Sequence, residues 1–382
     1  MPSGTSPAYP AAHLIVDRVK QRFAKHLENA RAAGHAPLAP PPDDEAIQSI
    51  VDAAFWASLR REEGVEPKIS LALVPPEQAG QPLRFQKRLP LLPAALARLA
   101  PAVERASIHL GVWREAGEPF YVWGTARSLP EVCFVIEVVA SGLLVIKQSG
   151  EPFGKFVNVA VLEGDQIKMV DERNAFMPEC PDVVQSLLGL DIDGLRGEAQ
   201  NVLVQIAASM RRHGRGGALL VVPAGSTTWR DSIVSPVLYA LDPPFTELSR
   251  LIREEHDATH QPEWQDALRN TIDAIGGLTA VDGATIISDA FEVLAFGAKI
   301  TPRRGNAGVD RVLASEPIEG SQSTFATPTQ LGGTRHLSAA QFVHDQRDAI
   351  ALVASQDGRF TIFRWSKAND AVHAHRVEAL LL

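Results

Sequence analysis

Two segments near the start of the chain place apolar residues at helical spacing. The first covers about residues 13–35, with Phe23 among its apolar positions, and the proline-rich run at 36–42 ends it. The second covers residues 47–61, and the acidic residues at 43–45 stand where the N-terminus of a helix favours negative charge. We therefore expect one helix before a proline-rich linker and one helix after it.

From residue 68 the pattern changes to short runs of β-branched and aromatic residues, which are typical of strands. A turn and a return strand follow over residues 163–170. We expect a mainly antiparallel sheet in this region, and we place the boundary to the next domain between about Pro178 and Gly194. The predicted strands cover residues 69–73, 108–112, 120–123, 132–138, 143–146 and 156–161.

The second half of the chain alternates helix and strand, as α/β domains do. A helix over about residues 198–212 precedes a buried strand over 216–223, and two hairpins follow, one after Asp282 and one around the turn at 356–359. The predicted fold class is therefore α/β, with a C-terminal mixed sheet flanked by helices and a preceding domain of helices and mainly antiparallel sheet. The predicted domains are 1–42 (first helix and linker), 43–185 (regulatory or partner domain) and 194–370.

Composition narrows the possible functions. Lys and Arg number 37 and Asp and Glu number 45, so a net charge of −8 does not favour binding to nucleic acid or to an anionic membrane. The most apolar stretch, 132–146, is shorter than the roughly 20 residues of a spanning helix and contains Glu137. The start lacks a secretory signal pattern, and two cysteines without a Cys-x-x-Cys pair fit a reducing compartment. We expect a cytoplasmic protein that binds neither a membrane nor nucleic acid directly.

A glycine loop at residues 331–333 opens a predicted helix and has the features of a phosphate site. Thr334 can cap the helix, and glycines let a ligand approach the backbone. Arg335 and His336 then stand beside the free N–H groups that bind phosphate at a helix N-terminus. Each residue also has a simpler explanation, since Arg335 can be a solvated side chain of the first turn and His336 a surface or capping histidine.

Two other patterns have both a structural and a chemical interpretation. Asp282 precedes Gly283, and Asp-Gly is a common turn as well as a possible source of a metal-binding carboxylate. His256 and His260 have the i, i+4 spacing of a zinc-binding helix, but no third ligand is evident, so a solvated helix face is the favoured interpretation. His373 and His375 are a weaker metal signal still.

Four motifs, taken in their order along the chain, resemble those of the diadenylate cyclase domain family, found in the DNA-integrity scanning protein and in membrane-bound cyclases. Each motif alone is weak, but their order, spacing and surrounding strands over about residues 196–368 make the resemblance fairly specific. The motifs are Gly217-Ala218-Leu219, Asp282-Gly283-Ala284, Gly333-Thr334-Arg335-His336 and Ser355.

The resemblance implies a diadenylate-cyclase-like domain that binds ATP or a related purine nucleotide. It further implies a face-to-face homodimer that joins two ATP molecules into cyclic di-AMP. Asp282 would be the catalytic carboxylate and the metal ligand, and with Mg²⁺ or Mn²⁺ it would activate a ribose 3′-hydroxyl for attack on an α-phosphate. The residues implied to bind the nucleotide are Gly283, Ala284, Gly333, Thr334, Arg335 and His336.

Two substitutions depart from the family pattern. Leu337 stands where the family has a second arginine, and Gln356 stands where it has a glutamate. Loss of a cation aimed at developing phosphate charge costs on the order of a hundredfold in rate. We also expect a long loop over residues 301–330, whose arginines 303, 304 and 311 could replace the missing charge or be simply solvated.

These departures leave two functional hypotheses. The first is a nucleotide sensor that has kept the binding fold but has weak or lost catalysis. The alternative is an active diadenylate cyclase, a nucleotidyltransferase that makes cyclic di-AMP from two ATP molecules with a divalent metal.

Overall fold

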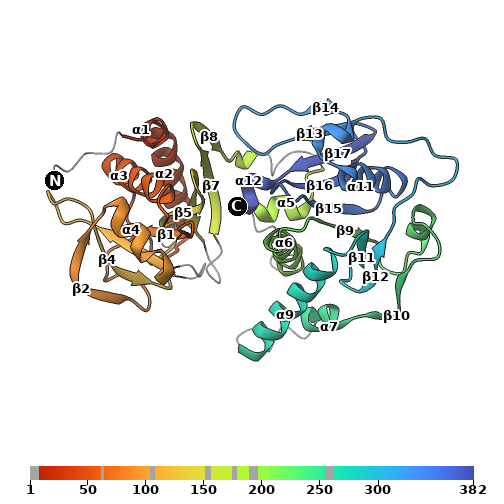
Figure 1. Ribbon diagram of the computed structural model, residues 1–382, viewed down its shortest axis with the longest axis horizontal. Helices are drawn as coiled ribbons and strands as arrows, with labels where there is room; N and C mark the ends of the chain where they lie inside the picture. The colour runs from red at the N-terminus through yellow and green to blue at the C-terminus, as the bar shows by residue number, and fades with distance from the viewer. Residues whose placement is uncertain are drawn as a thin grey trace. The chain divides into compact units, whose positions relative to one another are not determined.

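The computed structural model describes residues 8–61, 64–103, 108–150, 156–173, 179–188, 197–253 and 262–382. The chain forms two compact units, Met1–Val170 with Leu382 and Asp171–Leu381 (Figure 1). The division lies earlier than the boundary expected at about 178–194. The physical reason is helix α5 (Asp182–Leu187), which packs against α6 (Gly197–Arg212) of the second unit.

The first unit contains an eight-stranded sheet in the order β2-β4-β3-β1-β5-β6-β7-β8. Among the described strands, β1 and β3 run parallel, whereas the other neighbouring pairs are antiparallel, as the sequence predicted. The strands are β1 (Ile69–Leu73), β2 (Leu83–Pro90), β3 (His109–Trp113), β4 (Tyr121–Ala126), β5 (Phe134–Ala140), β6 (Leu143–Ser149), β7 (Phe156–Glu163) and β8 (Gln166–Met169).

Strand β2 was not predicted from the sequence. It forms one edge of the sheet, its residues are exposed or half-buried, and it carries Arg84, Lys87 and Arg88. Its apolar residues Leu83, Phe85 and Leu89 alternate with polar ones, but Lys87 interrupts the pattern and the strand was missed.

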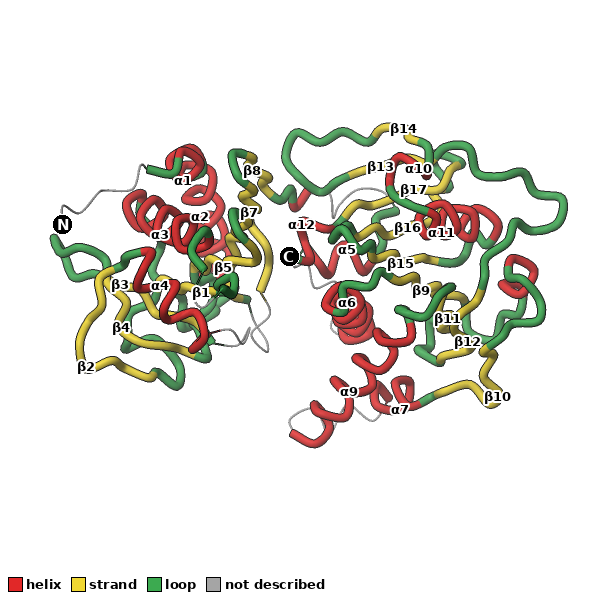
Figure 2. Tube along the Cα trace, viewed as in Figure 1, coloured by secondary structure: helices red, strands yellow, loops and turns green. Residues whose placement is uncertain are grey.

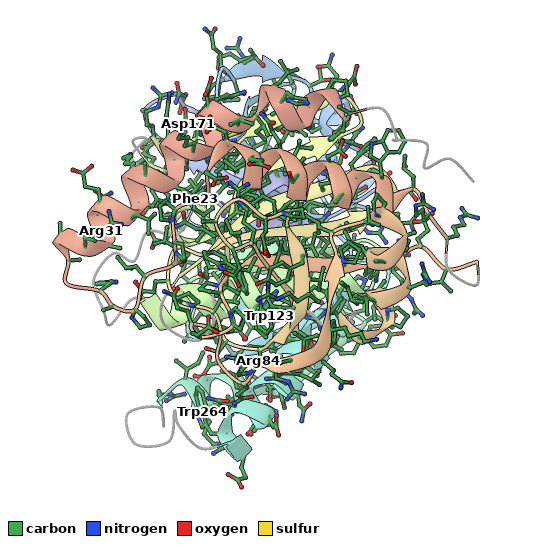
Figure 3. The ribbon with its side chains drawn as sticks, turned by 90° about the vertical axis from the view of Figure 1, so that its left-hand side faces the viewer. Phe23, Arg31, Arg84, Trp123, Asp171 and Trp264 are labelled. Carbon is green, nitrogen blue, oxygen red and sulfur yellow. The ribbon has the colours of Figure 1, made fainter. Side chains whose placement is uncertain are left out.

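Helices on one face of this sheet build the larger core of the first unit. They are α1 (Pro10–Leu14), α2 (Val16–Ala32), α3 (Asp44–Ser58) and α4 (Pro93–Leu99), followed by the 3₁₀ turn η1 (Ala100–Val103). Asp43 caps α3 by accepting a hydrogen bond from the Ala46 amide at 2.7 Å, so the acidic start predicted for this helix is confirmed. Figure 3 shows Phe23 on the side of α2 toward the strands, where it is fully buried against Phe134. The segment predicted as a separate first domain, 1–42, thus contributes to the same core.

The second unit contains a nine-stranded mixed sheet in the order β10-β12-β11-β9-β15-β16-β17-β13-β14. Strand β9 runs parallel to β11 and β13 runs parallel to β17, whereas the other described neighbours are antiparallel. The strands are β9 (Gly217–Val222), β10 (Tyr239–Phe245), β11 (Ala284–Ser288), β12 (Val293–Ala298), β13 (Val312–Ser315), β14 (Thr324–Ala326), β15 (Ile350–Ala354), β16 (Phe360–Ser366) and β17 (Ala371–Arg376).

Helices flank this second sheet on both faces (Figure 2). Helix α11 (Thr334–Asp345) packs on β15, β16 and β17 through Phe342 and Val343, whereas α6 contacts β15 from the other face and packs against α9 (Pro262–Leu278). The mixed α/β fold class predicted from the sequence is therefore confirmed. The remaining elements are η3 (Thr228–Ser232), α7 (Glu247–Arg253), α10 (Pro328–Leu331) and α12 (Glu378–Leu381).

The expected long loop at 301–330 is only partly a loop. It contains strands β13 and β14 at one edge of the sheet, and then α10, in which Pro328 takes a first-turn position that suits proline. The strands have four and three residues, too few to show periodicity in the sequence.

None of the helices that the structure describes is long and apolar enough to cross a membrane.

Candidate functional site

One pocket of the second unit brings together every site residue named from the sequence. Its volume is about 520 Å³, and it lies where β9 and β11 begin, where β12 and β15 end and where α11 starts. The predicted residues that line it are Asp282, Gly283, Ala284, Gly333, Thr334, Arg335 and His336. Side chains separated by about fifty residues in the sequence thus share one site.

The Asp-Gly turn has a strict structural requirement. Gly283 has a φ of +119°, and a Cβ at this position would lie 2.4 Å from the carbonyl carbon of Gly297. The backbone before β11 therefore passes directly against the end of β12, an approach that a larger residue prevents. Asp282-Gly283 therefore forms a tight turn and also lines the pocket, so the structural and the chemical interpretation are compatible.

Asp282 forms an ion pair with Lys299, which follows β12 directly. Both side chains reach water, since 89% of the Asp282 side chain and 52% of the Lys299 side chain are exposed. The Lys299 hydrogen bond and charge, together with the charge of Arg335, hold the pKa of the Asp282 carboxyl below its ordinary value.

Lys299 was missed in the sequence analysis, although it lines the pocket. Only the register of the β11–β12 hairpin could have identified Lys299. Because Ala284 pairs with Ala298, Lys299 and Asp282 lie just outside this pair, at the same end of the sheet. A strand pair predicted by composition alone does not give that register.

The start of α11 differs in detail from the prediction. Gly333 is the N-cap residue and no side chain caps the helix, so the expected capping role of Thr334 is wrong. Thr334 is instead the first helical residue, and its side chain is left to line the pocket. The first turn of any helix leaves N–H groups without intrahelical acceptors, and these favour an anion.

His336 is a packed residue rather than a surface histidine. It is 1% exposed, its ring meets Phe363 edge-on, and it lies so close over Gly332 that a Cβ there would be 2.3 Å from Nδ1. Burial lowers the pKa of its imidazole. Its Nε2 atom is buried and has no hydrogen-bond partner among the described residues. This neutral ring forms part of the pocket wall.

Arg335 reaches toward the loop after β15. A Cβ on Gly216 would lie 3.2 Å from its Nη1 atom and 3.5 Å from Cγ of Gln356. Gln356 itself donates from Nε2 to the Arg215 carbonyl at 3.2 Å. The Arg335 guanidinium and the Lys299 ammonium thus both belong to the pocket, with the alanines at the strand ends supplying small apolar surfaces between the polar groups.

The residues that depart from the family pattern lie outside the pocket wall. Leu337 is 38% exposed, and neither it nor Gln356 belongs to the lining. Arg303 pairs with Asp231 at 3.1 Å, and the guanidinium of Arg311 stacks over the Phe325 ring. The loop arginines, Arg304 included, do not line the pocket in the described part of the chain.

The lining of the pocket does not fit a resident divalent metal. Asp282 is the carboxylate that lines it, and that carboxylate is already paired with Lys299. Within the described residues, no three His, Cys, Asp or Glu side chains are grouped so that they could hold a metal ion. Stacked His373 and His375 on β17 belong to no such group, and His256 and His260 lie outside the described residues.

Comparison with known proteins adds one finding in the first unit. Residues 36–127 match the family described as "Probable sensor domain DACNV", a name built on that of the diadenylate cyclase domain. The match extends from before α3 to the end of β4 and stops well before the pocket of the second unit. No curated protein matches the chain. The comparison thus supports a probable sensor domain.

Proposed function

We propose that the second unit binds a purine nucleotide in the pocket around Asp282 and Arg335, and that the whole chain is a nucleotide sensor with weak or lost catalysis. The observation that carries the proposal is the convergence of Arg335, Lys299 and the start of α11 on one pocket. Two cations and a helix N-terminus together favour a phosphate group.

The size and the wall of the pocket suit a nucleotide. A volume of about 520 Å³ lies within the roughly 300–1,000 Å³ of small-molecule sites. Ala218, Ala284 and Ala298 offer small apolar surfaces for a base and a sugar, whereas the cations stand on the side of α11 and β12. The purine itself rests on the similarity of the four sequence motifs to those of diadenylate cyclases.

Weak catalysis follows from what surrounds Asp282. A carboxylate whose pKa is lowered by an ion pair with Lys299 is a poor base for a ribose hydroxyl. Leu337 and Gln356 supply neither a cation nor a carboxylate. An active diadenylate cyclase remains the alternative, because Asp282, Thr334 and Arg335 share one site.

The sensor role joins this pocket to the segment at 36–127, whose family is described as a probable sensor domain. We propose that nucleotide binding in the second unit is the event that the chain reports. The face-to-face homodimer and the absence of direct nucleic-acid binding stay predictions, which light scattering with and without nucleotide and a salt-dependent gel shift would check.

The test is calorimetry of the full chain with ATP, GTP and cyclic di-AMP. We expect at least one of them to bind with a Kd in the micromolar range, and Arg335→Ala to weaken that binding at least about tenfold, since a charge-assisted contact to phosphate is lost. Arg269→Ala, on an exposed position of α9, is the matched control and should leave affinity unchanged. No heat with any of the three on a folded sample would overturn the proposal.

Product analysis separates the sensor from the enzyme. Incubation of the protein with ATP and Mn²⁺ or Mg²⁺ should give little cyclic di-AMP. Rapid formation of cyclic di-AMP that Asp282→Asn abolishes would establish the alternative, an active diadenylate cyclase, while leaving nucleotide binding in place.

A further inference from the structure

The ion pair between Lys299 and Asp282 places a cation at the position where a metal would otherwise bind the carboxylate. The two residues stand side by side at one end of the β11–β12 hairpin, outside the Ala284–Ala298 pair. The hairpin register keeps them adjacent, because the Gly283 backbone packs directly against that of Gly297 at this end. The strands thus bring the two side chains together, and both remain open to water.

The charged side chains that line the pocket are mainly cations. Arg335 and Lys299 both line the pocket, and the one carboxylate of the lining in the described structure, Asp282, is paired with Lys299. Magnesium in nucleotide sites is usually held by one or two carboxylates together with substrate phosphates. A metal at Asp282 would sit beside the Lys299 ammonium, and two such cations a few ångströms apart repel each other.

We propose that Lys299 replaces the divalent metal, so that this pocket binds its nucleotide phosphate as a metal-free anion. The inference rests on the proposed function and specifies the ligand more closely. The bound form is a nucleotide whose phosphates are not chelated by Mg²⁺. A phosphate oxygen takes a hydrogen bond from the Lys299 ammonium, which has three donors and keeps one for Asp282. Asp282 is then a positioning residue that orients the ammonium toward the pocket.

The experiment is calorimetry of the full chain with ATP in EDTA and, separately, in excess Mg²⁺. Chelated ATP carries two fewer negative charges, so it is attracted less by Lys299 and Arg335. We expect binding in EDTA to be at least about tenfold tighter than in Mg²⁺. Equal affinity or tighter binding in Mg²⁺ would overturn the inference while leaving nucleotide binding intact, whereas no binding in either buffer would overturn the proposed function itself.

Variants at the ion pair give an independent readout. Lys299→Ala should weaken ATP binding in EDTA at least about tenfold and should make the remaining binding improve with Mg²⁺, because Asp282 is then open to the metal. Lys367 is an exposed lysine after β16 that lies outside the pocket. Lys367→Ala should therefore change neither the ATP affinity in EDTA nor the effect of Mg²⁺ on that affinity.

Asp282→Asn separates the positioning role from a metal-ligand role. It removes a negative charge beside the phosphate but keeps a hydrogen-bond acceptor for Lys299, so affinity in EDTA should stay within about threefold of the unmodified protein. Loss of all binding in Asp282→Asn, together with a gain from Mg²⁺ in the unmodified protein, would show that the carboxylate holds a metal.

Discussion

Both sheets of the molecule contain Ser–His hydrogen bonds, such as Ser315 with His373 at 2.8 Å in the second sheet, but the sheets differ in what lies beyond their strand ends. In the first unit, Ser70 and His109 are buried within the sheet and hydrogen-bonded to each other at 2.7 Å, and Glu137 on the neighbouring strand pairs with Lys147. In the second unit, β9 and β11 are wholly buried, and polar residues such as Asp282 and Thr334 gather beyond the strand ends.

This difference indicates where each unit can meet a ligand. Polar groups that satisfy one another inside a sheet stabilise a unique packing but leave little for a ligand to bind. Polar groups at strand ends remain reachable. The pocket lies where parallel strands β9 and β11 begin, so the usual rule that places ligands at the carboxyl ends of parallel strands does not locate it here. The antiparallel neighbours β12 and β15 do end at this edge.

The largest effect should come from removing core volume in the first unit. Phe23→Ala empties a fully buried site against Phe134, and we expect the free energy of unfolding of this unit to fall by about 4 kcal/mol. Urea unfolding followed by circular dichroism measures the loss. Nucleotide affinity should not change, and a parallel loss of affinity would show that the two units do not act separately.

In the second unit, we expect the largest loss of unfolding free energy from a substitution at Gly283, in the turn before β11. Gly283→Ala places a Cβ 2.4 Å from the Gly297 backbone at a φ of +119°, so we expect a loss of about 3 kcal/mol in unfolding free energy, together with loss of nucleotide binding. Gly358→Ala is the matched control. It also has a positive φ, +87°, but has open space around it, so only about 1 kcal/mol should be lost and binding should persist.

Acid should weaken the first unit through its buried histidine. Burial lowers the pKa of His109 to about 4, whereas an unfolded histidine has a pKa of about 6.5. The unfolded state therefore binds more protons below pH 6.5, and stability that is present at pH 7 is lost as the pH falls toward 4. Between pH 7 and pH 5 the loss should be about 2 kcal/mol.

The variant His109→Gln isolates this contribution. Hydrogen exchange of β1 and β3 should become less dependent on pH in the variant than in the unmodified protein. His373, whose pKa burial also lowers to about 4, provides the comparison in the second unit, where the pH dependence of β17 should be unaffected by the change at residue 109. An unchanged pH dependence of β1 and β3 would assign the acid loss to other groups.

The smallest effect should come from a helix cap. Asp43→Ala removes the acceptor for the Ala46 amide, and the first unit should lose about 1 kcal/mol in thermal or urea unfolding. Asp44→Ala, the next residue, removes the exposed ion pair with Lys20 and not the cap, so its loss should be smaller. Equal losses would mean that the ion pairs of Asp43 with Arg114 and of Asp44 with Lys20 matter more than the cap.

Much of the fold could be predicted because its strands are short apolar runs between clear turns. The predicted strands at 69–73 and 143–146 lie within β1 and β6, and Asp43 marks the start of α3. Strand β2 was missed, since Lys87 interrupts its alternation of apolar and polar residues and its edge position depends on pairing with β4. The same limit applies to β13 and β14 at the far edge of the other sheet.

Most of the residues that line the pocket of the second unit could be named from the sequence, but their electrostatic arrangement could not, and their functional role stays a prediction. The motifs named Asp282 and Arg335, and the structure brings them to one pocket. Lys299 is the residue that changes the chemistry of Asp282, and its position depends on which residues pair across the β11–β12 hairpin. His336 likewise depends on tertiary packing, because a sequence cannot say that its ring will lie over Gly332.

The exposed, basic strand β2 has a consequence for how molecules of this protein behave in a crowded solution. Its outer side offers backbone N–H and C=O groups that another strand could join, which is how sheets of separate molecules begin to aggregate. Arg84, labelled in Figure 3, pairs with Glu77, and Arg88 pairs with Glu115 and Glu118, so charged side chains line this edge, as they do on many natural edge strands. An irregularity in the β2–β4 register between Arg84 and Leu89 further disturbs the straight edge that a second strand would need. We therefore expect strand β2 to help keep the protein dispersed at high concentration.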